Sequence, residues 1–318
     1  MSEAFFIGID VSKATLDVAI LPGGETFTVN NDEKGFKALI KRLAPIKPEL
    51  IVMEATGGLQ NPAAIALAEA GLPVAIVNPR NVRHFAKALG VLAKTDALDA
   101  FVIARFAERM RPTARPLPDK EQRELVMCLT RRSQLTGMMT AEKNRLSSAP
   151  KGLQASIKKH ISYMKKEVKA IDQQAAAMIE ASSLWKAKDE LLQSAPGVGA
   201  TVSATLTAFL PELGKLDRKE IAALAGLAPI NRDSGKFRGK RAIWGGRAAV
   251  RTMLYLAALA AIRTNQAMKR CYAKLLAKGK VKKVAIVACM RRLLTALNAM
   301  CRDNAPWSNL ATGFSVDT

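Results

Sequence analysis

Histidine and cysteine are scarce in this chain, and their scarcity limits the chemistry that it can perform. The 318 residues include two histidines and four cysteines. No Cys-x-x-Cys pair occurs among Cys128, Cys271, Cys289 and Cys301, so a structural zinc site is not expected. Four scattered cysteines are instead typical of reduced thiols in a cytosol.

The sequence also lacks an export signal and a long apolar run. Its first residues, MSEAFFIGIDVSK, contain no basic segment followed by an apolar stretch. The longest apolar run, from Met253 to Ile262, is far shorter than the ~20 residues that cross a bilayer. We therefore expect a protein that is neither exported nor inserted in a membrane.

Acidic residues become rare toward the C-terminus. Residues 1–110 hold 12 basic and 12 acidic groups, residues 111–190 hold 16 and 9, and residues 191–318 hold 21 and 6. The net charge of +22 therefore lies in the second half of the chain, which indicates a polyanionic partner, above all nucleic acid. A membrane surface is the alternative, but no basic amphipathic helix with aromatic residues supports it.

The first segment alternates between strand and helix patterns. Apolar, β-rich runs predict strands, and helical spacing or glycine stops predict helices between them. The expected strands are 5–12, 15–21, 25–31, 49–55 and 73–78, and the expected helices are 34–44, 61–71, 81–89 and 96–110. This order predicts an α/β domain over residues 1–111, with a mixed sheet covered by helices.

Prolines at 112, 116 and 118 mark a boundary, and two long helical patterns follow over residues 112–188. The second pattern has an unbroken 4,3 apolar spacing at Ile157, Ile161, Met164, Val168, Ile171, Ala175 and Met178. The first has a weaker seam at Leu125, Cys128, Leu135, Met139 and Leu146, which Arg132 and Glu142 interrupt. We expect a coiled-coil helical hairpin that packs either on itself or on another subunit.

Residues 189–308 are predicted to form a basic, all-α domain, and residues 309–318 a tail. Residues 191–210 resemble a helix-hairpin-helix motif, in which Gly197 and Gly199 would let backbone amides approach a phosphate. A plain turn between two helices explains the same pattern. We find no internal repeat.

Four carboxylates have positions at which they could converge. Asp10 and Glu54 each end an expected strand, and Asp96 and Asp99 are three residues apart on an expected helix. Hard oxygen ligands of this kind suit Mg²⁺ with room for phosphate oxygens. Singly, each acid could equally cap a turn or be solvated, and we interpret Asp17 on the adjacent strand as structural.

Several strings occur in one order along the chain: GIDVSKATLDVA, MEATGG, VNPRNVRHFAKALG, KTDALDA, PGVG, LAGLAPINRDSGKFRGKR and RAAVRTMLY. Together they resemble the DEDD transposases of the insertion-sequence one-ten family, including its one-one-one-one subgroup. The resemblance covers residues 5 to 307. It implies a ribonuclease-H-like, RuvC-like N-terminal domain in which Asp10, Glu54, Asp96 and Asp99 bind Mg²⁺. It also implies that Ser234, followed by glycine, is the recombination nucleophile.

The resemblance further implies partners and a location. They are donor and target DNA, a structured guide RNA encoded by the element itself, and a homo-oligomer, a dimer or a tetramer, without a membrane. The protein would act in the prokaryotic cytoplasm, associated with the nucleoid. The segment IWGGR departs from family members that have lysine after the serine loop, which puts a basic contact there in doubt, although Arg247, its last residue, lies close by.

Ser234 needs activation, because a serine hydroxyl is a weak nucleophile at neutral pH. The chain has no G-x-S-x-G motif and no P-loop, and neither histidine is near Ser234 in sequence, so a hydrolase triad is not expected. We hypothesise that Mg²⁺ held by the four acids polarises a DNA phosphate that Ser234 attacks. Ser234 could instead only shape a basic turn.

The basic residues near these groups are candidates for contact with nucleic acid. They are Lys94, Arg232, Lys236, Arg238, Lys240, Arg241, Arg247 and Arg251. Such contacts mostly position the backbone without reading bases. Two other functions fit the charge distribution: a metal-dependent, structure-specific junction endonuclease that uses water, and a non-catalytic nucleic-acid-binding protein.

Overall fold

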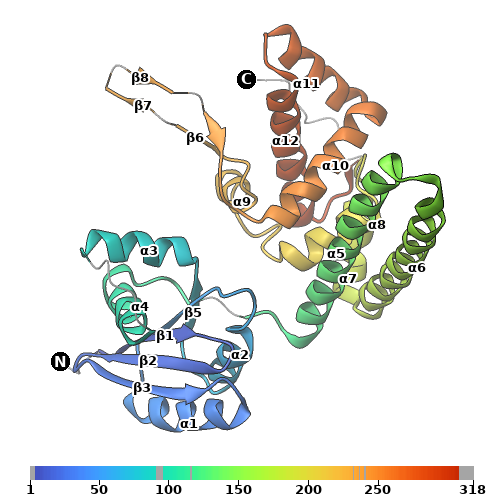
Figure 1. The fold of residues 1–318 in the computed structure, drawn as a ribbon. Helices are drawn as coiled ribbons and strands as arrows, with labels where there is room; N and C mark the ends of the chain where they lie inside the picture. The colour runs from blue at the N-terminus through green and yellow to red at the C-terminus, as the bar shows by residue number, and fades with distance from the viewer. Residues whose placement is uncertain are drawn as a thin grey trace. The chain divides into compact units, whose positions relative to one another are not determined.

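A computed structural model of the chain describes residues 4–90, 96–114, 117–231, 233–235, 237–239 and 241–307. The chain divides into two compact units, Met1–Pro118 and Asp119–Thr318 (Figure 1). Each unit has its own apolar core, and we describe the two separately.

The first unit is a mixed sheet with helices, as the sequence predicts. Its elements are β1 (Phe6–Val11), β2 (Thr15–Leu21), β3 (Glu25–Asn30), α1 (Glu33–Leu43), a 3-10 turn (Ala44–Ile46), β4 (Leu50–Glu54), α2 (Asn61–Glu69), β5 (Val74–Val77), α3 (Pro79–Ala88) and α4 (Asp96–Met110). The strand order is β3-β2-β1-β4-β5. β1, β2 and β3 pair antiparallel, whereas β1, β4 and β5 are parallel.

The two faces of this sheet have different covers, because side chains alternate along each strand. On one face Ile7, Ile9 and Met53 pack with residues of α1 and α2. On the other face Phe6, Ala19 and Val52 pack with residues of α3 and α4. Both faces are therefore buried, which explains the long apolar runs of the strands.

The second unit is mainly helical. Its helices are α5 (Lys120–Ser148), α6 (Lys151–Ala181), α7 (Ser183–Gln193), α8 (Ala200–Phe209), α9 (Arg218–Leu224), α10 (Ala248–Thr264), α11 (Gln266–Ala277) and α12 (Lys282–Asp303). The core lies between α7 and α12, and it includes buried Leu206, Leu254 and Leu293. Trp307 closes one end of this core, where its amide donates to Ser194 Oγ at 3.1 Å.

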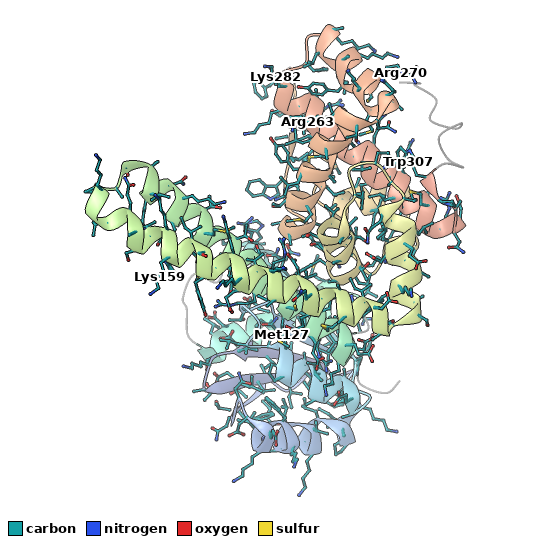
Figure 2. All side chains as sticks on the ribbon, turned by 90° about the vertical axis from the view of Figure 1, so that its right-hand side faces the viewer. Met127, Lys159, Arg263, Arg270, Lys282 and Trp307 are labelled. Atoms are coloured by element: carbon teal, nitrogen blue, oxygen red, sulfur yellow. The ribbon has the colours of Figure 1, made fainter. Side chains whose placement is uncertain are left out.

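Helices α5 and α6 form the expected hairpin, and it packs on itself. The apolar residues predicted for the two seams lie in two shared clusters, one of which contains Leu135, Ile161 and Met164. Arg132, which interrupts the seam, pairs with Asp172 of α6 at 2.5 Å. The supercoil that the heptad spacing predicts stays a prediction. Figure 2 shows the hairpin, with Lys159 on α6.

The base of the hairpin is attached to α8. Leu125 and Ile179 pack against Ala204 and Ala208 of that helix, and Gln122 Nε2 donates to the Ala208 carbonyl at 3.0 Å. Alanine and other small residues on α8 allow this close approach of three helices.

Helix α12 is central to the second unit. By length and composition it is the one helix among the described residues that could cross a membrane. Half of its most apolar window is buried, and side chains such as Leu293 and Leu297 pack in the core. Its apolar character therefore has an explanation within the fold.

The expectation of an all-α C-terminal domain is wrong in one place. Four short strands occur between positions 229 and 243: β6 (Pro229–Ile230), β7 (Asp233–Ser234), β8 (Phe237–Arg238) and β9 (Ala242–Ile243). β6 pairs with β9 and β7 with β8, both antiparallel. The resulting ribbon extends from the helices of its unit (Figure 1). Strands of two residues are too short for alternation to reveal them in a sequence.

Candidate catalytic residues and nucleic-acid interface

Asp10 and Glu54 lie at the carboxyl ends of neighbouring parallel strands. β1 and β4 pair with Ile9 opposite Met53, so the next residue of each strand is an acid. Phe6 of β1 and Val52 of β4 belong to the cluster on the α4 side of the sheet. By alternation the two half-buried acids belong to this same face.

Helix α4 begins near these acids because it runs antiparallel to β1 and β4. Arg111, directly after α4, donates to Glu49 at 3.0 Å, and Glu49 precedes β4. Its guanidinium also lies 5.1 Å from the ring centre of Phe6, the first residue of β1. The last turn of α4 is therefore at the amino ends of the strands, and its first turn, with Asp96 and Asp99, is at their carboxyl ends.

Gly8 sets the depth at which α4 packs. A Cβ at this position would overlap the Ala100 carbonyl oxygen and the Ala104 backbone nitrogen. Ala100 lies one turn after Asp96, so the contact fixes the start of the helix over the sheet edge where Asp10 lies. The glycine of the string GIDVS thus positions the acids without touching them.

Asp10, Glu54 and Asp99, the three acids whose side chains the structure describes, have the right donor atoms for a divalent metal, since Mg²⁺ binds carboxylate oxygens. Their geometry is less complete. Within the described ranges, no group of three His, Cys, Asp or Glu side chains could hold a metal ion as it stands. Asp96 begins α4, but its side chain lies outside the described residues. The metal-binding roles therefore stay predictions.

Asp17, which the sequence analysis interprets as structural, lies directly opposite Asp10 in the β1–β2 pairing. Directly opposed residues share a face, so Asp17 adds negative charge beside the predicted set. Thr28 Oγ1 donates to Asp17 Oδ1 at 2.6 Å. The signal that could have revealed this neighbour is the hairpin register, in which positions 10 and 17 are symmetric about the turn.

The loop after Glu54 is held by one buried side chain. Gln60 Oε1 accepts from the Thr56 amide at 2.9 Å and from the Gly58 amide at 3.1 Å. Gly57 and Gly58 both have positive φ, which this turn requires. The string MEATGG therefore encodes a rigid turn at the edge of the sheet.

Ser234 is exposed near the turn of the β7–β8 ribbon. It pairs with Phe237, and Gly235 between them has φ +52°. A left-handed residue in a short hairpin turn favours glycine, which explains the Ser-Gly sequence. The serine hydroxyl is thus accessible to a large substrate.

Of the basic residues predicted to contact nucleic acid, some lie in or near the ribbon and two lie at its base. Lys94, Arg232, Lys236 and Lys240 lie outside the described residues, as does the side chain of Arg238. Arg241 is exposed at the ribbon. Contact of these residues with nucleic acid stays a prediction.

Arg247 and Arg251 have structural partners at the base of the ribbon. Arg247 forms a two-fold ion pair with Glu212, at 2.5 and 2.6 Å, and donates to the Phe209 carbonyl at 2.8 Å. Arg251 Nη1 donates to the Gly245 carbonyl at 2.5 Å. Arg247 is therefore neutralised within the fold, and it anchors the segment that leads from the ribbon into α10.

The two glycines of IWGGR allow close packing where the ribbon joins the helical part of the unit. Gly245 and Gly246 have positive φ, and a Cβ on Gly246 would overlap the backbone of Gly226. A lysine at either position would be strained. The departure from the family pattern therefore has a packing reason.

Gly197 and Gly199 differ in their surroundings. Gly197, with φ +82°, lies against α10, where a Cβ would overlap the Ala257 carbonyl oxygen. Gly199 is exposed and caps α8, with space around its Cα. Helix packing explains the need for glycine at 197, and a phosphate contact at either residue stays a prediction.

Two sequence models match this chain. One, described as Transposase and specific for the DEDD enzymes of IS110 elements, matches residues 7–153. The other, described as Transposase IS116/IS110/IS902 family, matches residues 189–273. The chain belongs to the IS110 transposase family. This membership places it among enzymes that process DNA.

Relatives of the transposase match it over different shares of its length. The pilin gene-inverting protein of Moraxella bovis is 28% identical over 95% of this chain and 97% of its own length. An uncharacterized 42 kDa protein of insertion element IS900 from Mycobacterium paratuberculosis is 34% identical over 48% of this chain and 40% of its own. A T. thermophilus RuvC structure in complex with a Holliday junction substrate covers 36% of this chain and 100% of its own, at 19% identity and a TM-score of 0.28.

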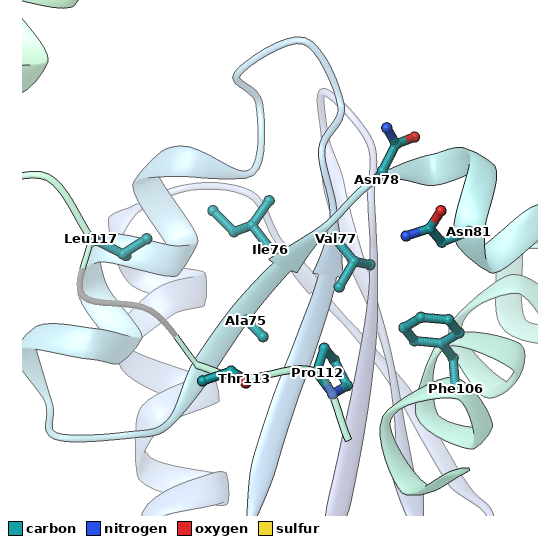
Figure 3. A pocket seen from close by; sticks show the side chains of 9 residues that line it. All are labelled: Ala75, Ile76, Val77, Asn78, Asn81, Phe106, Pro112, Thr113 and Leu117. Carbon is teal, nitrogen blue, oxygen red and sulfur yellow. The ribbon is translucent and has the colours of Figure 1, made fainter. Parts of the chain in front are cut away.

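The transposase also has a pocket of about 490 Å³ beside the edge strand β5 (Figure 3). It is lined by Ala75, Ile76, Val77, Asn78, Asn81, Phe106, Pro112, Thr113 and Leu117. None of these lining residues is an acid, a base or a cysteine. The lining therefore supplies no carboxylate for a metal ion, although Val77 lies opposite Glu54 in the pairing of β4 and β5.

Proposed function

We propose that this transposase cuts and exchanges DNA strands through Ser234, with Asp10, Glu54, Asp96 and Asp99 as Mg²⁺ ligands. The observation that carries the proposal is the position of Asp10 and Glu54 at adjacent strand ends, at the edge where α4 begins. Bound there, Mg²⁺ would polarise the scissile phosphate and favour ionisation of the attacking hydroxyl.

The chemistry at Ser234 is a transesterification. Its Oγ loses a proton to solvent and bonds to phosphorus, while the bond from phosphorus to the leaving DNA oxygen breaks and that oxygen takes a proton from solvent to become a hydroxyl. The phosphoserine ester keeps the energy of the cut bond, so a second DNA hydroxyl can displace Ser234 without ATP. The exposure of Ser234 on a ribbon supports this role, because a duplex is too large to enter a buried site.

We assign the other roles by segment. Residues 1–111 would bind the metal, the helical hairpin within residues 112–188 would contact another subunit, and residues 189–308 would bring the serine and the basic surface to DNA. An element-encoded RNA would select donor and target, and a dimer or tetramer would cut the strands together in the cytoplasm. The exposed cations of the second unit support both nucleic-acid partners.

Covalent trapping tests the serine. We expect a protein–DNA adduct with wild-type protein and Mg²⁺, and its loss in Ser234→Ala and in EDTA. Ser203→Ala is the matched control, since its hydroxyl is fully buried in α8 and cannot reach DNA. An adduct that survives Ser234→Ala would overturn the proposal.

The same experiment separates the alternatives. A junction endonuclease that uses water would leave free DNA ends and be indifferent to Ser234→Ala. A non-catalytic binding protein would retain its DNA affinity in EDTA and cut no strand with Mg²⁺.

A further inference from the structure

Phe237 is an exposed aromatic residue in a protein with few aromatics, which make up 5% of its residues. Its side chain is 66% exposed. Every other phenylalanine that the structure describes is at least partly buried. Trp244, directly after β9, is equally exposed, and Tyr163 on α6 is 58% exposed. Exposure therefore makes the Phe237 ring available to a partner without identifying that partner.

The position of Phe237 ties it to the serine. Ser234 and Phe237 are directly opposed in the β7–β8 pair, so both side chains are on the same face of the ribbon. Opposed residues have Cβ atoms ~4.5–5.5 Å apart. Successive nucleotides in a strand are ~3.4 Å apart, so a phosphate at Ser234 brings a neighbouring base within reach of the ring.

The charge around Phe237 selects the kind of partner. Residues 236–241, Lys-Phe-Arg-Gly-Lys-Arg, contain four cations and no acid, and Asp233, opposite Arg238 in the ribbon, is the one acid between residues 221 and 302. An apolar protein surface would have to desolvate these charges, whereas a nucleic-acid strand neutralises them and offers a base to the ring.

We propose that Phe237 stacks on an unpaired nucleobase next to the phosphodiester that Ser234 attacks, an inference that rests on the proposed function. A base in a continuous duplex has no free face, so the ring would fill the place of a neighbouring base that has been displaced from the stack. Phe237 is then a positioning residue that fixes the scissile phosphate by holding the nucleoside beside it.

Stacking can be measured without cleavage. The probe is a synthetic duplex that spans the junction between the element end and its flanking DNA, with 2-aminopurine placed in turn on either side of the junction. With the Ser234→Ala protein we expect 2-aminopurine fluorescence to change on binding at one position. Adding Phe237→Ala should remove this change, and Phe237→Trp should restore it.

The rate of adduct formation is the second measurement, in protein with Ser234 intact. Phe237→Ala should slow it about 5- to 150-fold, the range expected when an aromatic ring no longer stacks on a base, and Phe237→Trp should be close to wild type. Tyr163→Ala is the control, since Tyr163 is 58% exposed on α6. Unchanged fluorescence and rate in Phe237→Ala would overturn the inference and leave the serine mechanism intact.

Two further outcomes are separable. An adduct that persists in Ser234→Ala would overturn the proposed function, whatever Phe237 does. Dissociation of the DNA-free oligomer by Phe237→Ala, measured by light scattering, would assign the ring to a subunit contact and overturn the stacking inference.

Discussion

At Cys271 the surroundings favour the ionised thiol. A hydrogen bond from the Cys289 thiol and the nearby Arg292 charge lower the pKa of Cys271 to about 6, against the opposing effect of burial. Arg292 Nη1 lies 3.2 Å from Cys271 Sγ. Cys301 is the contrast, since burial raises its pKa.

We predict an absorbance step at 240 nm near pH 6 in the folded protein. Cys271→Ser should lack the step, Cys301→Ser should retain it, and Arg292→Met should move it to higher pH. Because the folded pKa is depressed, the stabilisation from this thiolate is full above pH ~9 and is lost as pH falls through about 6. A titration of wild-type protein without this step would contradict the prediction.

Single residues differ in how far the sequence predicts them. Asp10 and Glu54 end buried strands, so their shared edge follows from strand order alone. The ion pair of Arg247 could not be predicted in this way, because Glu212 is distant in sequence and the contact depends on tertiary packing. The sequence does not distinguish an arginine that is hydrogen-bonded within the fold from one that is available to bind a phosphate.

At the scale of elements, the contact between β1 and α4 is made through backbone. Gly8→Ala would push a methyl group into the backbone of Ala100 and Ala104. We predict a loss of about 1–3 kcal/mol in the free energy of unfolding, with a lower melting temperature. Urea unfolding followed by circular dichroism measures it.

Gly137→Ala is the matched change in the opposite direction. Gly137 is exposed inside α5, and an added Cβ would have nothing within 4 Å. Alanine there should stabilise the helix by about 0.5–1 kcal/mol. If both alanine variants were equally destabilised, the close approach at Gly8 would not be the cause.

Elements whose residue pattern continues over many positions could be predicted from the sequence. Elements that depend on contacts between distant residues could not. The heptads of α5 and α6 repeat over many turns, and the strands of the sheet are long apolar runs. The ribbon at 229–243 has strands of two residues, held at its base by the approach of Gly226 to Gly246. No local pattern encodes that approach.

At the scale of the whole molecule, charge is concentrated on the second unit. Between Asp233 and Asp303 the sequence contains no acidic residue. Exposed cations occur along α11, in the turn after it and at the start of α12, where Figure 2 labels Arg270 and Lys282; they are Lys269, Arg270, Lys274, Lys278, Lys280, Lys282 and Lys283. This surface is suited to a phosphate backbone.

Salt dependence of DNA binding tests this surface. Replacing Lys280, Lys282 and Lys283 by alanine should weaken binding and reduce the slope of log K against log salt by ~0.9 for each duplex phosphate that the protein no longer neutralises. Fluorescence anisotropy over a salt series measures the slope. Alanine at exposed Lys34, Lys37 and Lys41 of α1 removes the same charge from residues 1–110, which carry no net charge, and the slope should then stay unchanged.

The α5–α6 hairpin has a consequence for how this protein can vary. Its base is fastened to α8 by one cluster, and its outer part is held by a second cluster with no residue from α7 to α12 among the described members. Removing one heptad from each helix in the outer part would leave the attachment intact. The hairpin is thus an arm whose length can change by whole heptads while its attachment to α8 stays the same.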